Sequence, residues 1–237
     1  MSDSLTIGEK RRLSRLALDL IAWASENGRD FPWRSENAST YERIAVEVLL
    51  QRTTATAVGR FYGKFFERFP SWESLAEAGE ANLEEFLKPL GLWRRRAAAM
   101  VRLARYAAHR EGVFPIDPAA HAEIPAVGQY VSNAILLFQH GRAAPLIDVN
   151  MARVIERFLR PRRLADIRHD PWLQSAAHWL VRHDAIETCW AVLDFAALVC
   201  KARSPGCSDC PVSSRCAFVR QAKPGQRLFS ETSRAAS

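Results

Sequence analysis

Residues Glu123-Ile-Pro-Ala-Val-Gly-Gln-Tyr130, an apolar run, and then Pro145-Leu-Ile-Asp-Val-Asn150 form the stretch of sequence that decides the fold. Pro125 is expected to end one helix, and Gly128 to supply the flexible backbone from which the next helix begins. Apolar residues then recur at helical spacing as far as Phe138. The stretch predicts a helix, a tight hairpin and a second helix, whose first backbone N–H groups can meet an anion such as a phosphate.

Two acidic residues interrupt apolar segments. Asp148 lies within Pro145–Val149, and Glu47 lies within Val46–Leu50. A carboxylate among apolar neighbours costs free energy unless it is paired or functional, and burial raises the pKa of a glutamate so that it can hold a proton near neutral pH. The ordinary alternatives are that Asp148 only caps the helix after it, and that Glu47 lies on a solvated face of its helix.

Four cysteines, Cys200, Cys207, Cys210 and Cys216, follow the pattern C-x6-C-x2-C-x5-C. Four thiolates this close in sequence can close around one metal centre. The N-terminus lacks a signal-peptide core, so a cytoplasmic setting without disulfides is expected. From the spacing alone, a zinc ion and an iron–sulfur cluster are both open. The fifth cysteine, Cys189, is expected to be a small buried apolar residue.

Composition limits the remaining possibilities. The 237 residues are 48% hydrophobic and 25% charged, as in an ordinary soluble protein of one or two domains. No apolar run is long enough to span a membrane. The net charge of +7 favours an anionic partner, nucleic acid first, although many soluble proteins are mildly basic. No strand-like alternation of useful length occurs, so the expected fold class is all-α.

Two further motifs complete a family pattern. Phe31-Pro-Trp-Arg34 precedes the helix of Glu47, and Glu47-x-Leu-Leu-x-x-Thr-Thr54 ends it. With the hairpin, Asp148 and the four cysteines, these motifs resemble the helix-hairpin-helix DNA glycosylases of the endonuclease III and MutY superfamily. The resemblance runs from Phe31 to Cys216. It implies a monomeric base excision repair enzyme that carries a [4Fe–4S] cluster and acts on double-stranded DNA with a mismatched or damaged base.

The resemblance also implies the architecture. The family fold has two helical domains with the active site in the cleft between them. Residues 30–145 are expected to form a six-helix barrel that contains the helix-hairpin-helix. Residues 1–29 and 146–220 are expected to form the N-terminal helix and the iron–sulfur cluster domain, and residues 221–237 a flexible tail.

The family pattern assigns catalytic roles to Asp148, Glu47, Tyr130 and Asn150. Asp148 would stabilise positive charge on the sugar, Glu47 would assist the departing base, and Asn150 would hold the sugar–phosphate or the catalytic carboxylate. Tyr130 stands where bifunctional relatives carry a lysine that forms a Schiff base with the sugar. A tyrosine cannot form one, so a monofunctional DNA N-glycosylase with little or no AP lyase activity is predicted.

The DNA-binding residues implied by the resemblance are Gln51, Arg52, Leu92, Trp93, Val127, Gly128 and Gln129. Gln51 would fill the space left by the flipped base, Arg52 would meet a phosphate, and Leu92 or Trp93 would act as a wedge. The ordinary alternatives are that Gln51 and Arg52 form only a polar turn between helices, and that the arginines after Trp93 lie on a solvated helix face. The hairpin departs from the family pattern at Ala126, where most members have glycine.

The excised base is predicted from two features. Leu49-Leu-Gln-Arg-Thr-Thr54 is closer to the Mig-type thymine-DNA mismatch glycosylases than to the MutY type, which usually reads Leu-Gln-Gln-Thr. The sequence ends about 20 residues after Cys216, so the C-terminal domain with which MutY-type enzymes recognise 8-oxoguanine is expected to be missing. We therefore predict removal of thymine or uracil opposite guanine by a nucleoid-associated enzyme. The alternatives are a MutY-like adenine DNA glycosylase acting on A:G or A:8-oxoG, and a non-catalytic iron–sulfur DNA-binding protein.

Overall fold

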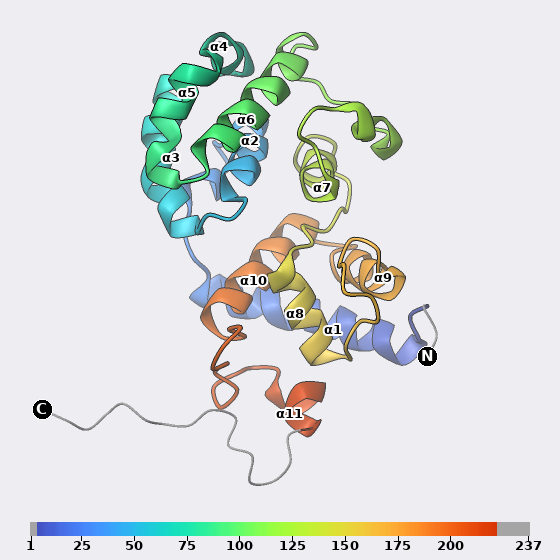
Figure 1. Ribbon diagram of the computed structural model, residues 1–237. Coiled ribbons are helices and arrows are strands. Elements are labelled where there is room, and N and C mark those ends of the chain that lie inside the picture. Colours follow the sequence, from blue (N-terminus) through green and yellow to red (C-terminus); the bar gives the residue numbers. More distant parts are fainter. Residues whose placement is uncertain (1–3, 222–237) are drawn as a thin grey trace, which may run out of the picture. The chain divides into compact units, whose positions relative to one another are not determined.

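The structure is a computed structural model that describes residues 4–221; apart from Gln221, the predicted tail lies outside this range. Every regular element within the described range is a helix, which confirms the all-α prediction (Figure 1). The chain divides into two compact units. The middle unit is Asp30–Arg142, and the terminal unit combines Met1–Arg29 with Ala143–Ser237. No described helix combines the length and the apolar character needed to cross a membrane.

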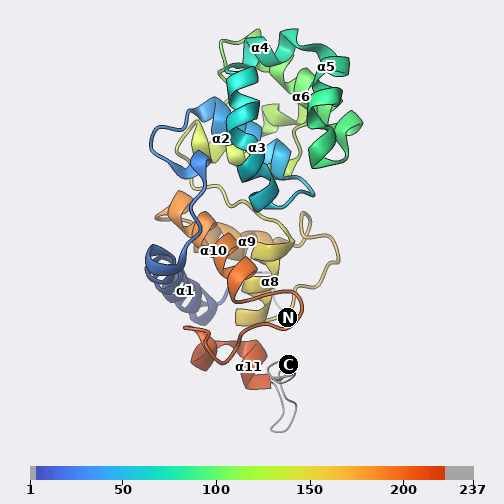
Figure 2. The same cartoon turned by 90° about the vertical axis from the view of Figure 1, so that its left-hand side faces the viewer.

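The middle unit contains six α-helices. They are α2 (Thr40–Leu50), α3 (Ala55–Arg68), α4 (Trp72–Glu77), α5 (Gly79–Leu87), α6 (Trp93–Ala108) and α7 (Gln129–Phe138). Three short 3₁₀ helices join them: η1 (Pro32–Arg34), η2 (Lys88–Leu90) and η3 (Pro118–Glu123). Helix α6 packs against α4 and α5, and α2 packs against α3, α6 and α7 (Figures 1 and 2).

The core of the middle unit is strongly aromatic. Phe65 of α3 and Phe69, which directly follows this helix, are almost completely buried. Trp33 of η1 is 3% exposed and stacks on Phe31 with the ring centroids 4.5 Å apart. The Phe31–Arg34 motif therefore fills the space beneath its loop, as expected of aromatic residues that pack a core.

The terminal unit is built around the long helix α1 (Ile7–Asn27). Its other helices are α8 (Val149–Phe158), α9 (Pro171–Leu180), α10 (Ala185–Leu198), η4 (Ser213–Arg215) and α11 (Ala217–Gln221). Helix α1 packs against α9 and α10, while α8 packs against α9, α10 and α11. The unit thus joins the two ends of the described chain through contacts between helices far apart in sequence.

Local capping explains where several helices begin. The hydroxyl of Thr6 accepts a hydrogen bond from the Glu9 N–H, and the Glu9 carboxylate accepts one from the Thr6 N–H. Ser39 and Glu42 form the same reciprocal pair at the start of α2. These capping boxes satisfy N–H groups that a helix leaves unpaired at its first turn.

The hairpin differs in detail from its prediction. Its first helix is the 3₁₀ helix η3, capped by Asp117, whose carboxylate accepts from the Ala119 N–H at 3.0 Å. The residue in the left-handed region is Ala126, with φ 64°, whereas Gly128 is extended at φ −95° and ψ −178°. The expectation that Gly128 supplies the flexible backbone is therefore wrong. The left-handed backbone costs Ala126 conformational free energy that a glycine at this position would not lose.

Candidate active site

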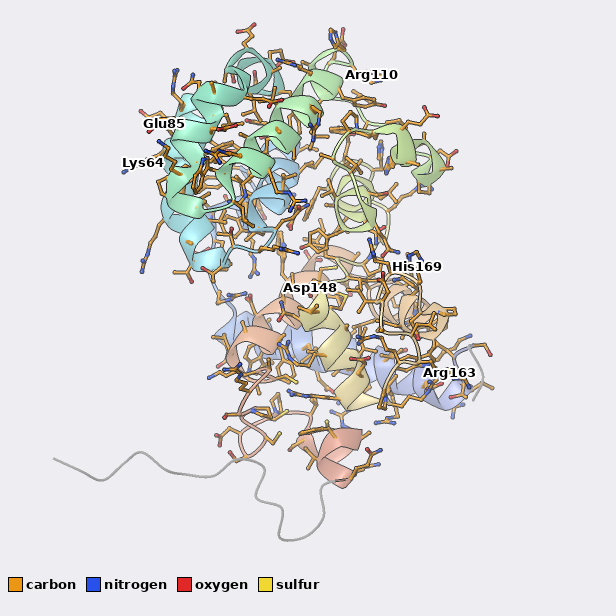
Figure 3. The ribbon with its side chains drawn as sticks, in the orientation of Figure 1. Lys64, Glu85, Arg110, Asp148, Arg163 and His169 are labelled. Carbon is orange, nitrogen blue, oxygen red and sulfur yellow. The ribbon has the colours of Figure 1, made fainter. Side chains whose placement is uncertain are left out.

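Asp148 is the N-cap of α8, where Figure 3 shows it at the start of the helix. Its Oδ1 accepts hydrogen bonds from the backbone N–H groups of Asn150 at 2.9 Å and Met151 at 2.8 Å. The Asn150 side-chain Nδ2 donates to Oδ2 at 2.5 Å. Asp148 therefore does cap α8, as the ordinary alternative proposed. Asn150 holds its carboxylate, which is one of the two roles predicted for Asn150. Both carboxylate oxygens are held in a fixed orientation.

Two opposing influences act on the Asp148 carboxylate. Burial raises its pKa above the ordinary value, and this effect outweighs the hydrogen bonds from Met151 and Asn150 and the positive charge of Arg153. The N-terminus of α8 also favours a negative charge. The result is a carboxylate that is costly to ionise but oriented for use as an anion, a combination typical of functional groups.

A chain of hydrogen bonds leads from Asp148 toward the cysteines. The Arg153 Nη2 donates to Asn150 Oδ1 at 3.1 Å and to the Ala196 carbonyl at 3.0 Å. The Arg153 Nε donates to the Cys200 carbonyl at 2.8 Å. Arg153 therefore connects the group that orients Asp148 to the first predicted metal ligand. This contact was not anticipated from the sequence.

Glu47 is buried in the middle unit, with only 2% of its surface exposed, so the alternative of a solvated face is wrong. It lies on α2 and accepts a hydrogen bond at Oε2 from the Tyr130 hydroxyl, with the two oxygens 2.8 Å apart. Tyr130 is the second residue of α7. The packing of α2 against α7 thus brings together two residues predicted to be catalytic but separated by 83 positions.

The first two pairs of predicted DNA-binding residues lie on two turns of the middle unit. Gln51 ends α2 and Leu92 precedes α6; both side chains are exposed, Leu92 by 49%. Arg52 is exposed, and Trp93 is half-buried as the first residue of α6. Both Arg52 and Leu92 have left-handed backbones, with φ of 57° and 51°. Each turn therefore exposes side chains to solvent and contains one residue, Arg52 or Leu92, with a strained backbone.

Arg96 is a residue whose importance the sequence reasoning missed. The arginine-rich run predicted a solvated face, yet Arg96 is 6% exposed. Its guanidinium hydrogen-bonds groups of both turns described above. Helical spacing could have revealed it, because it lies on the same face as Met100, Leu103 and Ala107, all of which are buried.

The third group of predicted DNA-binding residues lies at the hairpin. The Val127 N–H donates to the Ile124 carbonyl at 3.2 Å and closes the turn. Gly128 is exposed, and a side chain added there would meet no atom within 4 Å. Gln129 begins α7 and is half-buried. The backbone at Gly128 is therefore accessible to a large anion.

The four predicted metal ligands line one pocket of the terminal unit. The Cys216 thiol donates to the Arg157 carbonyl at 3.2 Å, and Arg157 Nη1 lies 3.5 Å from the Cys200 sulfur. Burial raises the pKa of the Cys210 thiol to about 11, and the negative charges of the other three thiolates contribute to the shift. Burial and the charges of Cys216 and Cys200 also raise the pKa of Cys207. Four such thiols become thiolates when a cation compensates their charge.

The donor set tests which cofactor fits. The cysteines share the pocket with apolar side chains, among them Leu16, Val154 and Phe195. In the described part of the chain, no three histidine, cysteine, aspartate or glutamate side chains converge on a point where one metal ion would sit. A pocket ringed by four thiols fits a cluster of several atoms, and an all-thiolate set is a usual iron–sulfur ligand set. Cys189 is fully buried in α10, as predicted.

Comparison with known proteins supplies the family. Residues 45–167 match the family described as "HhH-GPD superfamily base excision DNA repair protein". This chain belongs to that superfamily. It is 35% identical over 216 residues to the thymine-DNA glycosylase of Aeropyrum pernix, covering 89% of this chain and 96% of the relative. It is 35% identical over 209 residues to the thymine/uracil-DNA glycosylase of Pyrobaculum aerophilum, covering 85% and 90%.

An adenine-specific relative matches less of its own length. The adenine DNA glycosylase of Mycobacterium tuberculosis strain H37Rv is 30% identical over 197 residues, which cover 82% of this chain and 64% of the relative. Among solved structures, a thermostable thymine-DNA glycosylase superposes with a TM-score of 0.80 at 28% identity, covering 90% of this chain and 98% of the other. A trapped endonuclease III–DNA covalent intermediate shares the fold at 21% identity, covering 92% and 99%, with a TM-score of 0.72. The predicted family, fold and activity class, a base excision DNA glycosylase, are confirmed.

Proposed function

We propose that this HhH-GPD protein is a monofunctional DNA glycosylase that removes thymine or uracil mispaired with guanine. The choice of base is supported by the Aeropyrum and Pyrobaculum relatives, whose names specify thymine and thymine/uracil. The observation that carries the mechanism is the hydrogen bond from Tyr130 to the buried carboxylate of Glu47. A phenol that holds a carboxylate leaves this position without an amine to attack the sugar.

Asp148 supplies the negative charge in this mechanism. As the glycosidic bond breaks, its electron pair leaves with the base nitrogen and the sugar C1′ becomes cationic. The ionised carboxylate stabilises that cation, and a water molecule then adds its oxygen to C1′ and gives up a proton. The hydrogen bonds from Asn150 and Met151 fix the carboxylate in advance, so it does not need to reorient as charge develops.

Glu47 acts on the leaving base. Its burial on α2 favours the protonated form of the side chain, which can donate a proton or a hydrogen bond to the departing base. Tyr130 orients the carboxyl group by donating to Oε2. The products are a free base and an abasic sugar. The DNA strand stays intact because no enzyme amine forms a covalent intermediate with C1′.

Cys200, Cys207, Cys210 and Cys216 would hold a [4Fe–4S] cluster. When bound, the cluster supplies a rigid cross-link between the segments that carry the four thiolates, and the hydrolysis requires no electron transfer. Arg153 and Arg157 tie this loop to α8 through backbone carbonyls, including Cys200 and Lys201. The purified protein should contain iron and acid-labile sulfide in equal amounts and absorb visible light; one zinc ion per chain without sulfide would contradict the cluster.

DNA is the partner of this reaction. Gln51 would enter the space left by the flipped base, and Leu92 or Trp93 would separate the neighbouring base pair. The exposed backbone at Gly128 would meet a phosphate, helped by the N-terminus of α7. The exposed Arg52 adds a positive charge at the first turn.

The decisive experiment incubates the purified protein with T:G, U:G, A:G and A:8-oxoG duplexes and reveals abasic sites with alkali. We expect release from T:G and U:G, with no strand cleavage before alkali is added. Borohydride should trap no stoichiometric covalent adduct with the wild type. A Tyr130→Lys variant, which introduces the missing amine, serves as the matched control for trapping.

Each alternative has its own outcome. Release confined to adenine in A:G and A:8-oxoG would show a MutY-like enzyme. Binding to every duplex without release of any base would show a non-catalytic DNA-binding protein. A stoichiometric borohydride adduct with the wild type would overturn the monofunctional assignment and leave the choice of base intact.

A further inference from the structure

Arg96 joins the two turns that carry Gln51, Arg52 and Leu92. We call residues 51–53 and 90–92 the insertion turns. The Arg96 Nη2 donates to the Gln51 carbonyl at 2.8 Å and to the Thr53 Oγ1 at 2.6 Å. The Nη1 donates to the Gly91 carbonyl at 2.5 Å and to the Leu90 carbonyl at 3.2 Å. One planar guanidinium thus contacts both insertion turns, one with each of its terminal nitrogens.

The acceptors enclose the strained positions. Gln51 and Thr53 stand on either side of Arg52, and Leu90 and Gly91 directly precede Leu92. A left-handed conformation costs free energy in a residue other than glycine, so neither turn is the conformation that its residues prefer by themselves. Four hydrogen bonds from a single buried side chain offset this cost and hold both turns in place.

The charge of Arg96 is not cancelled by a carboxylate. Its acceptors in the described part of the chain are three carbonyls and a hydroxyl, and it takes part in no ion pair there. A buried guanidinium without a carboxylate is expensive and is retained where its planar geometry is needed. Lysine could not replace it, because one ammonium group cannot reach both turns in the same way.

We infer that Arg96 is a positioning residue for base flipping, which holds the two insertion turns so that Gln51 and Leu92 enter the DNA together. This inference rests on the proposed function of the same site. The ligand is a duplex whose lesion base must leave the stack, a step that costs more free energy for a paired base than for an unpaired one. Arg96 should therefore matter most when the lesion base is paired.

The test compares single-turnover release of the same thymine from a T:G pair and from a single-base bulge. Arg96→Met and Arg96→Lys should slow release from T:G by at least about tenfold, while release from the bulge changes by less than about threefold. Thr53→Val removes one acceptor of Arg96. It should lower the ratio of the T:G release rate to the bulge release rate in the same direction, but by a smaller factor. Arg102→Met, an exposed arginine on the same helix, is the matched control and should keep the wild-type ratio.

A second readout does not depend on chemistry. A 2-aminopurine placed next to the lesion should fluoresce more strongly when the wild type opens the stack, and the Arg96→Lys complex should lack this increase at saturating protein. The inference would be overturned if the Arg96 variants slowed thymine release from T:G and from the bulge equally. It would also be overturned if both variants kept the wild-type ratio of the two release rates. Absence of base release by the wild type would overturn the proposed function instead, and the fluorescence comparison would still decide the role of Arg96.

Discussion

The two carboxyl groups predicted to be catalytic, Glu47 in the middle unit and Asp148 in the terminal unit, are held in different ways. Glu47 lies among the buried residues of α2 and accepts a hydrogen bond from the Tyr130 phenol. Asp148 lies at the first turn of a helix and receives two backbone hydrogen bonds and one from Asn150. The first carboxyl group is enclosed by a buried stretch of helix, and the second is oriented by backbone and side-chain donors at a helix start.

In the proposed mechanism, this difference would let one fold provide an acid and an anion at the same pH. Neither residue type decides the role, since aspartate and glutamate have similar ordinary pKa values. We expect the proposed roles to follow from the surroundings of each carboxyl group and from its place on the helix. Variants at both carboxyl groups would test this contrast.

Asp148→Asn removes the anion and keeps a side chain that can cap α8. We expect base release to fall by roughly 10³-fold, because a preorganised charge at the reacting sugar is lost. The measurement is single-turnover release from T:G with alkali. The matched control is Asp170→Asn, which changes another N-cap aspartate in the same unit, at the start of α9. Unchanged release by Asp148→Asn would remove the basis of the mechanism.

Glu47→Gln removes the proposed proton donor, and we expect base release to fall by roughly 10²-fold. Tyr130→Phe keeps the ring and deletes one hydrogen bond to Glu47, so we expect a loss of about tenfold. The pH profile separates the two variants. Tyr130→Phe should move the basic limb of the rate profile, which reports the Glu47 carboxyl, whereas Glu47→Gln should abolish that limb. If Tyr130→Phe leaves the basic limb where it is, the hydrogen bond does not tune Glu47.

The two N-cap aspartates should respond to pH with opposite signs in stability. Burial alone would raise the pKa of Asp170, but hydrogen bonds from Leu164, Leu173 and Arg163 outweigh it and lower the pKa. Asp170 therefore stabilises the fold above its unfolded pKa, and this contribution is lost as the pH falls. Asp170→Asn should cost about 1–3 kcal/mol at neutral pH, because donors lose their acceptor, and less in acid.

Asp148 should behave in the reverse sense. Because burial raises its pKa in the folded state, its contribution is fully present below the unfolded pKa and is lost as the pH rises through the folded pKa. Asp148→Asn should therefore be as stable as the wild type or more stable at neutral pH. Urea unfolding at several pH values measures both variants. Parallel losses at neutral pH would show that Asp148 is only a structural cap.

The smallest effects are expected at the hairpin. Ala126→Gly should raise the free energy of unfolding by about 0.5–1 kcal/mol, because relief of the left-handed alanine exceeds the entropy that glycine adds to the unfolded chain. Gly128→Ala should change stability by less than about 0.5 kcal/mol, since its backbone is extended and its surroundings are open. If a DNA phosphate approaches the Gly128 backbone, Gly128→Ala should bind an undamaged duplex more weakly than the wild type does, although its stability is almost unchanged. Binding as tight as in the wild type would place the phosphate elsewhere.

Much of this protein could be predicted because the relevant physics is local. Ser39 and Glu42 lie three residues apart, and their capping box begins α2 wherever that helix packs. Asp148 and Asn150 lie within one turn, so the hydrogen bond between them follows from their spacing. The four cysteines, the helical periodicity and the acidic residues in apolar segments are likewise readable in the sequence, and so they indicated the family and the all-α fold.

Other features depend on segments that are distant in the chain. Arg96 looked like one member of a charged run, and only the packing of α6 against α2 brings it to the Gln51 carbonyl, 45 positions away. Arg153 reaches Cys200 across 47 positions, and Tyr130 reaches Glu47 across 83. The left-handed backbone at Ala126 rather than Gly128 was set by closure of the turn. Sequence determined which helices form and which residues can do chemistry, whereas the tertiary structure decided which of them meet, because long-range hydrogen bonds leave no periodic pattern in the chain.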